Sequence, residues 1–263
     1  MKKQLLVCAF NDAIIDKQGA IAPGSLDQIK QFIDAGNAFA ITTPHLDAAI
    51  RYVENVNGFK ATYRVSQQGS VALDSHDDVI FQAVLGSTVV HELNRIVFAG
   101  SWQVAITTAA HRYVTAGTKY PARWEFARND VPVDDLQTVT DRANFKPLTY
   151  ELIGTVADMK QTALAIRYAL GHLVQVDTPN ETTLLVRSLD ASPANALLQI
   201  MHVDGFAPDD VIVVGNDASV LPLFDLSGRT FAVGQADAAV VQAAHQKIGS
   251  LGELIERSFT VAE

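Results

Sequence analysis

The sequence predicts an α/β fold in which helices cover both faces of a mainly parallel sheet, with an α+β unit inserted into it. Short, continuously apolar runs are typical of strands that are buried on both faces. Three such runs stand out, at 4–10, 38–42 and 211–214. Helical patterns separate them, and this alternation indicates parallel strands joined by helical crossovers. From about 85 to 186 the alternation is lost, which indicates the inserted unit.

Two domains are therefore expected. The first combines 1–84 with 187–263 and holds the parallel sheet, and the second is the inserted α+β domain of 85–186. A chain of 263 residues is long enough to give each of them a buried core.

Two helices are predicted in the first segment. The first is expected to begin at Ser25, because Ser25 and Gln28 have the spacing of a capping box, and to end at Gly36. Positions 26, 29, 32 and 33 give it one apolar stripe. The second helix follows Pro44 and carries apolar residues at 46, 49, 50 and 53.

The same pattern returns near the C-terminus. Ser192 and Pro193 are expected to cap and begin a helix, and Gly215 ends the aliphatic strand 211–214. A short strand at 230–233 and further helices complete this half. In the inserted unit, strands are predicted at 102–107, 150–156 and 173–176, with a helix at 160–170.

Composition limits the partners. Twenty basic and 29 acidic residues give a formal net charge of −9, which disfavours broad binding to the nucleic-acid phosphate backbone. Cys8 is the only cysteine, so no intramolecular disulfide can form. No apolar run reaches about 18 residues and the N-terminus has no signal-peptide pattern, so we expect no membrane span and a cytoplasmic protein.

Four short segments stand where the predicted strands end or a helix begins. They are Ala9-Phe10-Asn11-Asp12, Thr42-Thr43-Pro44-His45, Ser192-Pro193-Ala194-Asn195 and Gly215-Asn216-Asp217-Ala218-Ser219-Val220. By these segments and the order of its elements, the chain resembles the haloacid dehalogenase (HAD) superfamily, in particular its Cof-type or sucrose-phosphatase-like branch. The resemblance implies a Rossmann-like core, a large α+β cap and the motifs of a magnesium-dependent phosphatase.

The chain departs from that family at its catalytic positions. Ala9 stands at the position of the nucleophilic aspartate, Asn11 at that of the general acid/base, and Pro193 at that of the lysine. Asn216 and Val220 replace the two acids of the fourth motif. The family forms an aspartyl-phosphate, which requires a carboxylate nucleophile, and magnesium is usually held by carboxylates. We therefore expect a pseudoenzyme that needs no cofactor.

The remaining polar residues favour binding. Asn11, Thr43, His45, Asn216 and Ser219 are the candidate ligand-binding residues, and Thr43 keeps the hydroxyl of the second motif. Removing like-charged carboxylates makes an anion easier to hold without a metal. We expect a small phosphorylated or sugar-like ligand between core and cap.

Two alternatives stay open. In the first, the chain is a magnesium-dependent phosphohydrolase for a small sugar phosphate that uses unorthodox residues, with Asp12 and Asp217 as weak candidate metal ligands. In the second, it is a regulatory or interaction subunit that uses the fold as a surface, although the sequence names no protein partner.

Overall fold

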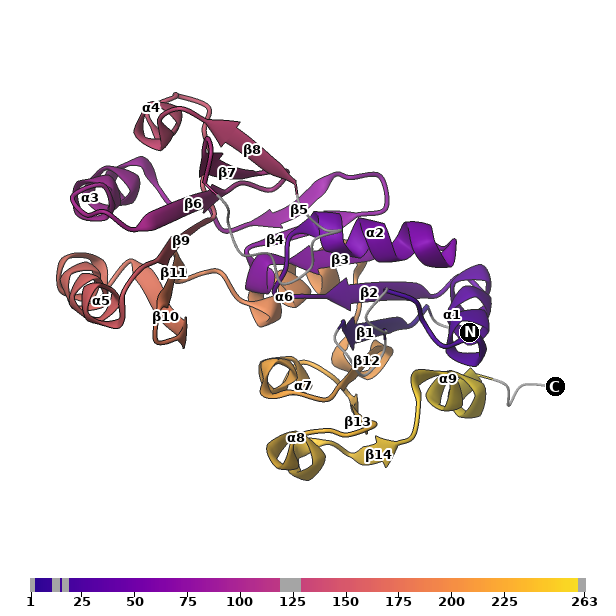
Figure 1. Cartoon of the computed structure of the whole chain (residues 1–263). Helices are drawn as coiled ribbons and strands as arrows, with labels where there is room; N and C mark the ends of the chain where they lie inside the picture. Colours follow the sequence, from indigo (N-terminus) through magenta and orange to yellow (C-terminus); the bar gives the residue numbers. More distant parts are fainter. Residues whose placement is uncertain (1–2, 11–14, 16–18, 119–128, 260–263) are drawn as a thin grey trace. The chain divides into compact units, whose positions relative to one another are not determined.

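The computed structural model describes residues 3–10, 15, 19–118 and 129–259. The chain divides into two compact units, one made of 1–81 with 192–263 and the other of 82–191 (Figure 1). We call the first the parallel-sheet unit and the second the inserted unit.

The parallel-sheet unit is built on one eight-stranded sheet among the described residues. Its strands are β1 (Leu5–Ala9), β2 (Ala38–Thr42), β3 (Tyr63–Ser66), β4 (Val71–Asp74), β5 (Val79–Gln82), β12 (Val211–Gly215), β13 (Arg229–Val233) and β14 (Gln246–Ile248). The spatial order is β14-β13-β12-β1-β2-β3-β4-β5. The pairs from β14 to β3 are parallel and β3–β4 is antiparallel. Strand β1 lies between β12 and β2 (Figure 1).

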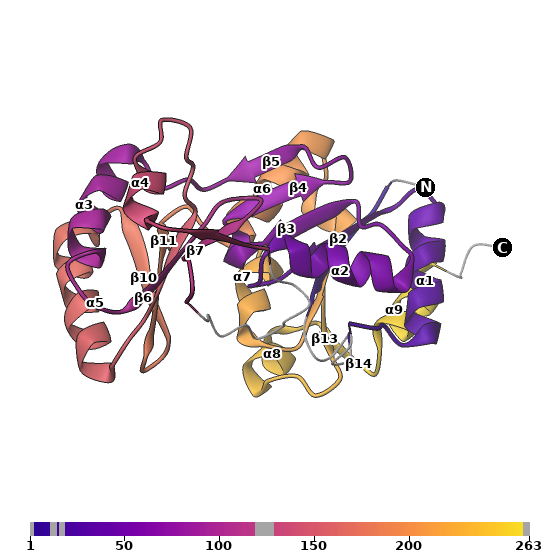
Figure 2. The same ribbon diagram turned by 45° about the horizontal axis from the view of Figure 1, so that its top comes forward.

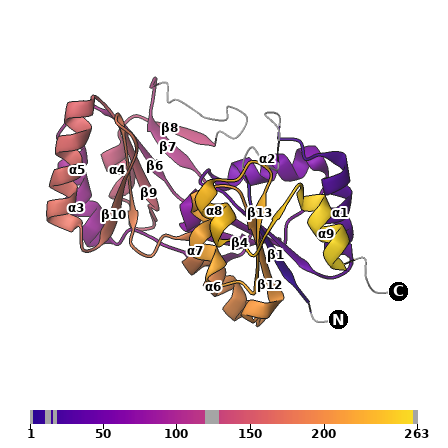
Figure 3. The same cartoon turned by 90° about the horizontal axis from the view of Figure 1, so that it is seen from below.

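Helices cover both faces of this sheet, which confirms the predicted fold class. They are α1 (Pro23–Asp34), α2 (Asp47–Asn57), α6 (Pro193–Asp204), α7 (Leu221–Phe224), α8 (Ala238–Ala243) and α9 (Leu251–Phe259), with short 3₁₀ turns η1 (Gln67–Gly69), η3 (Pro208–Asp210) and η4 (Ala218–Val220). The side chains of α6, α7 and α8 share one core cluster with β1, β2, β3 and β12. Helices α1 and α9 contact each other and lie with α2 on the opposite face (Figure 3).

The predicted start of the first helix was wrong by two residues. Helix α1 begins at Pro23 after Ala22, and no side chain caps it. The Ser25 hydroxyl instead accepts a hydrogen bond from the backbone N–H of Gly252 at 3.1 Å, which ties α1 to α9. Gly36 does follow the helix end as predicted, with a φ of +85° that glycine adopts freely. By contrast, the predicted cap of α6 is confirmed, since the Ser192 hydroxyl accepts from the Asn195 N–H at 3.0 Å.

A network of charges around a buried arginine joins α2 to the β3–β4 hairpin and the turn after it. Arg64 has a fully buried side chain, and it contacts Asp47 at 2.8 Å and Asp77 at 2.6 Å. Arg51 contacts the same two carboxylates, at 2.7 and 2.8 Å. Burial alone would lower the pKa of Arg64, but its attraction to Asp47 and its hydrogen bonds raise that pKa. We call these four residues the Arg64 network.

The inserted unit has a separate sheet with two long helices. Its elements are α3 (Ser87–Val97), β6 (Gln103–Thr107), β7 (Arg112–Thr115), β8 (Asp130–Val133), α4 (Leu136–Thr140), β9 (Thr149–Ile153), α5 (Val156–Leu170), β10 (Val174–Asn180) and β11 (Thr183–Ser188). The strand order is β10-β11-β9-β6-β7-β8, antiparallel except for β7 with β8. Helices α3 and α5 pack side by side against this sheet and share its core (Figure 2).

Among the residues that the structure describes, no helix has both the length and the apolar character needed to cross a membrane.

Candidate functional site

The predicted site lies in the parallel-sheet unit, where three neighbouring parallel strands end. Ala9 of β1 is opposite Thr42 of β2, and Cys8 of β1 is opposite Val214 of β12. Adjacent strands are about 4.8 Å apart. The described residues that directly follow these three strands, Phe10, Thr43 and Asn216, therefore emerge at one edge of the sheet.

Ala9 ends the central strand inside the hydrophobic core. It is 4% exposed and shares a core cluster with Leu5 and Val7 on the same face of β1. Its methyl group has no atom that could attack phosphorus. Cys8 is no substitute, because successive strand residues point to opposite faces and burial raises the pKa of its thiol. Asn11 and Asp12 follow in sequence and lie outside the described residues.

Hydrogen bonds with β3 and with the turn after it hold the segment after β2 in place. The Thr43 N–H donates to the Val65 carbonyl at 2.9 Å, and the buried Thr43 hydroxyl accepts from the N–H of His45 at 3.3 Å. The His45 carbonyl in turn accepts from the Gln67 N–H at 2.7 Å. Since a hydroxyl that accepts one hydrogen bond still carries an O–H donor, Thr43 keeps the means to bind an anion. His45 is half-buried beside it.

The turn after β3 explains the glycine at position 69. Gln67, Gln68 and Gly69 all have φ between +54° and +79°. A Cβ on Gly69 would lie 2.1 Å from the carbonyl carbon of Ser192 and 2.2 Å from the nitrogen of Pro193. Only glycine fits this close approach. The turn therefore packs directly on the first residues of α6.

Two residues that flank this turn were missed by sequence reasoning. Ser66 and Ser70 are completely buried on either side of it, and neither hydroxyl has a hydrogen-bond partner among the described residues. A buried hydroxyl without a partner is unfavourable and calls for an explanation. The only sequence signal was the pair of small polar residues that flanks the glycine turn.

Side-chain packing covers the end of β12 in the fourth sequence segment, 215–220. Val220 is fully buried, and a Cβ on Gly215 would lie only 2.2 Å from its Cγ1 atom. The valine side chain therefore packs directly over the end of β12. Asn216 is half-buried, and its carbonyl accepts from the Asp237 N–H at 2.7 Å. Asp217 caps the short turn η4, because its Oδ1 atom accepts from the N–H of the exposed Ser219 at 2.8 Å.

These donors do not fit the magnesium site that the resemblance implies. Ala9 and Val220 supply no side-chain oxygen ligand, and Asn216 supplies a neutral amide in place of a carboxylate. The described residues contain no group of three His, Cys, Asp or Glu side chains that could hold a metal ion. Because hard divalent cations need several oxygen ligands with negative charge, these residues support no reaction step through magnesium.

Comparison with known proteins identifies the family. The profile of the haloacid dehalogenase-like hydrolases matches residues 6–251, nearly the whole chain. No curated protein sequence matches.

Solved structures resemble the chain in fold. One is a haloacid dehalogenase-like hydrolase from Bacteroides thetaiotaomicron, with a TM-score of 0.85, 16% identity and coverage of 98% of this chain and 100% of that one. A protein from Thermotoga maritima gives a TM-score of 0.86 at 12% identity, with 97% of each chain covered. A sugar phosphatase of HAD subclass IIB gives 0.70 at 12% identity, covering 99% of this chain and 100% of its own.

Proposed function

Because the chain belongs to the haloacid dehalogenase-like hydrolase family, we propose that it is a member without the covalent phosphatase chemistry, which binds a small phosphorylated or sugar-like ligand. The observation that carries this proposal is Ala9. It ends the central strand of the sheet, where the family's motif has its nucleophilic aspartate, and its buried methyl group cannot form a phosphoryl-enzyme bond.

Val220 and Pro193 also argue against phosphatase chemistry. Val220 fills with hydrocarbon the position where the family has an acid, and Pro193 offers no charge at the position of the lysine. Since general acid/base catalysis alone contributes about 10²- to 10⁴-fold to a rate, the loss of nucleophile, lysine and metal-binding acids together removes the family's reaction.

Binding is supported by what remains at the strand ends. Thr43 presents a hydroxyl on a loop whose backbone is fixed by β3 and by the turn at Gln67. With Ala9, Asn216 and Val220 in place of carboxylates, these positions carry no negative charge to repel an anion. One of the similar structures is a sugar phosphatase, which makes sugar phosphates the first ligands to test.

A titration with glucose 6-phosphate, in the presence of EDTA, tests this function. Binding is expected to raise the melting temperature as ligand concentration rises and to release heat in calorimetry. Thr43→Val should weaken binding about tenfold, the loss of one hydrogen bond to a charged group. Thr115→Val, the same change at an exposed residue of the inserted unit, is the matched control.

Turnover decides between the proposal and the phosphohydrolase alternative. We expect no hydrolysis of p-nitrophenyl phosphate above background, with or without magnesium. Magnesium-dependent hydrolysis that Asp12→Asn or Asp217→Asn abolishes would contradict the proposal. A stable protein complex without any ligand-induced rise in melting temperature would favour the interaction subunit instead.

Restoring the motifs tests the assignment of positions. The quadruple variant Ala9→Asp, Asn11→Asp, Pro193→Lys and Asn216→Asp should gain magnesium affinity, measured by calorimetry, if these residues converge as assigned. A folded variant that binds no magnesium would show that the assigned positions are wrong.

A further inference from the structure

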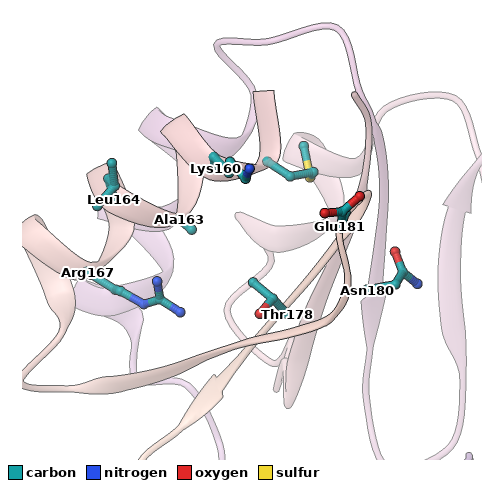
Figure 4. Close-up of a pocket in the computed structure, with 8 residues that line it drawn as sticks. Lys160, Ala163, Leu164, Arg167, Thr178, Asn180 and Glu181 are labelled. Atoms are coloured by element: carbon teal, nitrogen blue, oxygen red, sulfur yellow. The ribbon is translucent and has the colours of Figure 1, made fainter. Parts of the chain in front are cut away.

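The inserted unit contains a pocket of its own between helix α5 and the β10–β11 hairpin (Figure 4). Its volume is about 500 Å³, within the usual range for small-molecule sites. The lining residues come from the helix and the hairpin: Met159, Lys160, Ala163, Leu164, Arg167, Thr178, Asn180 and Glu181. None of them is among the candidate ligand-binding residues at the ends of β1, β2 and β12, so a ligand of this pocket is independent of the proposed function.

One face of α5 forms the helical wall. Lys160, Ala163, Leu164 and Arg167 recur at intervals of three and four residues, which places them on the same side of a helix. Ala163 is 3% exposed, whereas Leu164 is 67% exposed and stands at the rim. The two cations are about 10 Å apart along the helix axis. The wall is therefore apolar in the middle and cationic at each end.

The two ends differ in net charge. In Figure 4 the Glu181 carboxylate points toward the helix on the side of Lys160, so an acid and a base face each other across that end. At the other end, Arg167 is the only charged lining residue. Its Nη2 atom donates to the Val176 carbonyl at 2.8 Å, which fixes the guanidinium at the pocket edge. A guanidinium has five N–H donors, so this bond leaves the planar group able to bind an anion.

We propose that this pocket binds a small amphipathic carboxylate. The carboxylate pairs with Arg167, because the guanidinium fork matches the geometry of a carboxylate. The hydrocarbon body lies against Met159, Ala163 and Leu164, and it covers the exposed leucine. An apolar surface combined with a small number of polar and charged groups is the usual composition of a small-molecule site.

Octanoate and octanol are the probes, because they share a hydrocarbon chain and differ in the anionic group. Saturation-transfer NMR and calorimetry on the full chain measure their binding. Octanoate should bind more tightly than octanol. Arg167→Gln should weaken octanoate about tenfold to a hundredfold and leave octanol nearly unchanged, which is the expected effect of removing a charged hydrogen bond. Arg95→Gln, the same change on an exposed face of α3, is the matched control.

A second variant guards against a folding defect in Arg167→Gln, which also loses the bond to Val176. Leu164→Asp changes an exposed side chain and should weaken both probes, with an unchanged circular dichroism spectrum. Equal octanoate affinity in the Arg167→Gln and Arg95→Gln variants would overturn the proposal. It is also wrong if octanoate fails to bind at millimolar concentration, or if Leu164→Asp only dissociates a dimer, since the face is then a self-association surface.

Discussion

Two regions of the parallel-sheet unit differ in the charge of their buried side chains. In the Arg64 network, two arginines and two aspartates contact one another, and Arg64 itself has no exposed surface. At the ends of β1 and β12, the uncharged side chains of Ala9 and Val220 are buried among hydrocarbon. Both regions are parts of one sheet and its helices.

The difference shows that buried charge in this unit occurs where the chain supplies partners of opposite charge. A buried charge is tolerable when a partner of opposite charge and hydrogen bonds compensate its desolvation. In the Arg64 network the chain itself supplies these partners, namely the carboxylates of Asp47 and Asp77 and the backbone carbonyl of Asp74. Carboxylates at the strand ends would depend on a bound cation and a lysine, because like charges repel each other. Without such a cation, uncharged residues such as Ala9 and Val220 avoid the desolvation cost of a buried carboxylate.

The largest expected change in the free energy of unfolding is in the Arg64 network. Arg64→Met leaves the carboxylates of Asp47 and Asp77 without their buried cation, so the free energy of unfolding should fall by about 3–5 kcal/mol. Urea unfolding at pH 7 measures it. Arg51→Met is the control, because Arg51 is 45% exposed and its partly solvated ion pairs contribute about 1 kcal/mol or less. Equal losses in the two variants would remove the distinction between the buried and exposed arginines.

An acid introduced among the buried uncharged residues should destabilise the fold. Val220→Asp buries a carboxylate without a partner and should lower the free energy of unfolding by roughly 3 kcal/mol at pH 7. Burial raises the pKa of such a carboxyl, so its ionisation destabilises the folded state as pH rises above about 4, and the loss should be smaller at pH 4. Ser219→Asp is the exposed control. A fully stable Val220→Asp protein would mean that the end of β12 already contains a compensating cation.

Asp77 is expected to make a smaller contribution to the free energy of unfolding, and this contribution is lost in acid. Slight burial acts to raise the pKa of Asp77, but hydrogen bonds from Arg64 and Arg51 outweigh it and hold that pKa below its ordinary value. The unfolded state then binds more protons, so this contribution is complete above about pH 4 and is lost as pH falls through the lowered pKa. Asp77→Asn should lose roughly 0.5–1 kcal/mol at neutral pH and show a flatter dependence between about pH 3 and 5. An unchanged pH profile in urea unfolding would argue against the pairing.

The smallest effect is expected at Asn216. Its side chain is half-buried at the edge of the sheet, so Asn216→Asp should change the free energy of unfolding by only about 0.5 kcal/mol. Urea unfolding beside Val220→Asp makes the contrast direct. A loss above about 2 kcal/mol would show that packing, and not only chemistry, excludes an acid at this position as well.

Much of the fold could be predicted because its signals are local. The runs at β1, β2 and β12 are continuously apolar, and a strand buried on both faces needs just that. The cap at Ser192 was also readable, since it depends on residues three apart. The strands β3, β4, β5 and β14 were not predicted, and Ser25 was assigned to the wrong partner. These elements are short or depend on contacts with distant segments.

The sequence by itself determined the parallel sheet, the family resemblance and the absence of acids at Ala9, Asn216 and Val220. Only the tertiary structure decided that Val220 covers the end of β12, that Gly69 packs on Ser192 and Pro193, and that Arg64 joins Asp47 to Asp77. It also formed the pocket at Arg167. The physical reason is range: hydrophobic period and capping act between near neighbours, whereas close packing and buried ion pairs join residues that meet only when the chain has folded.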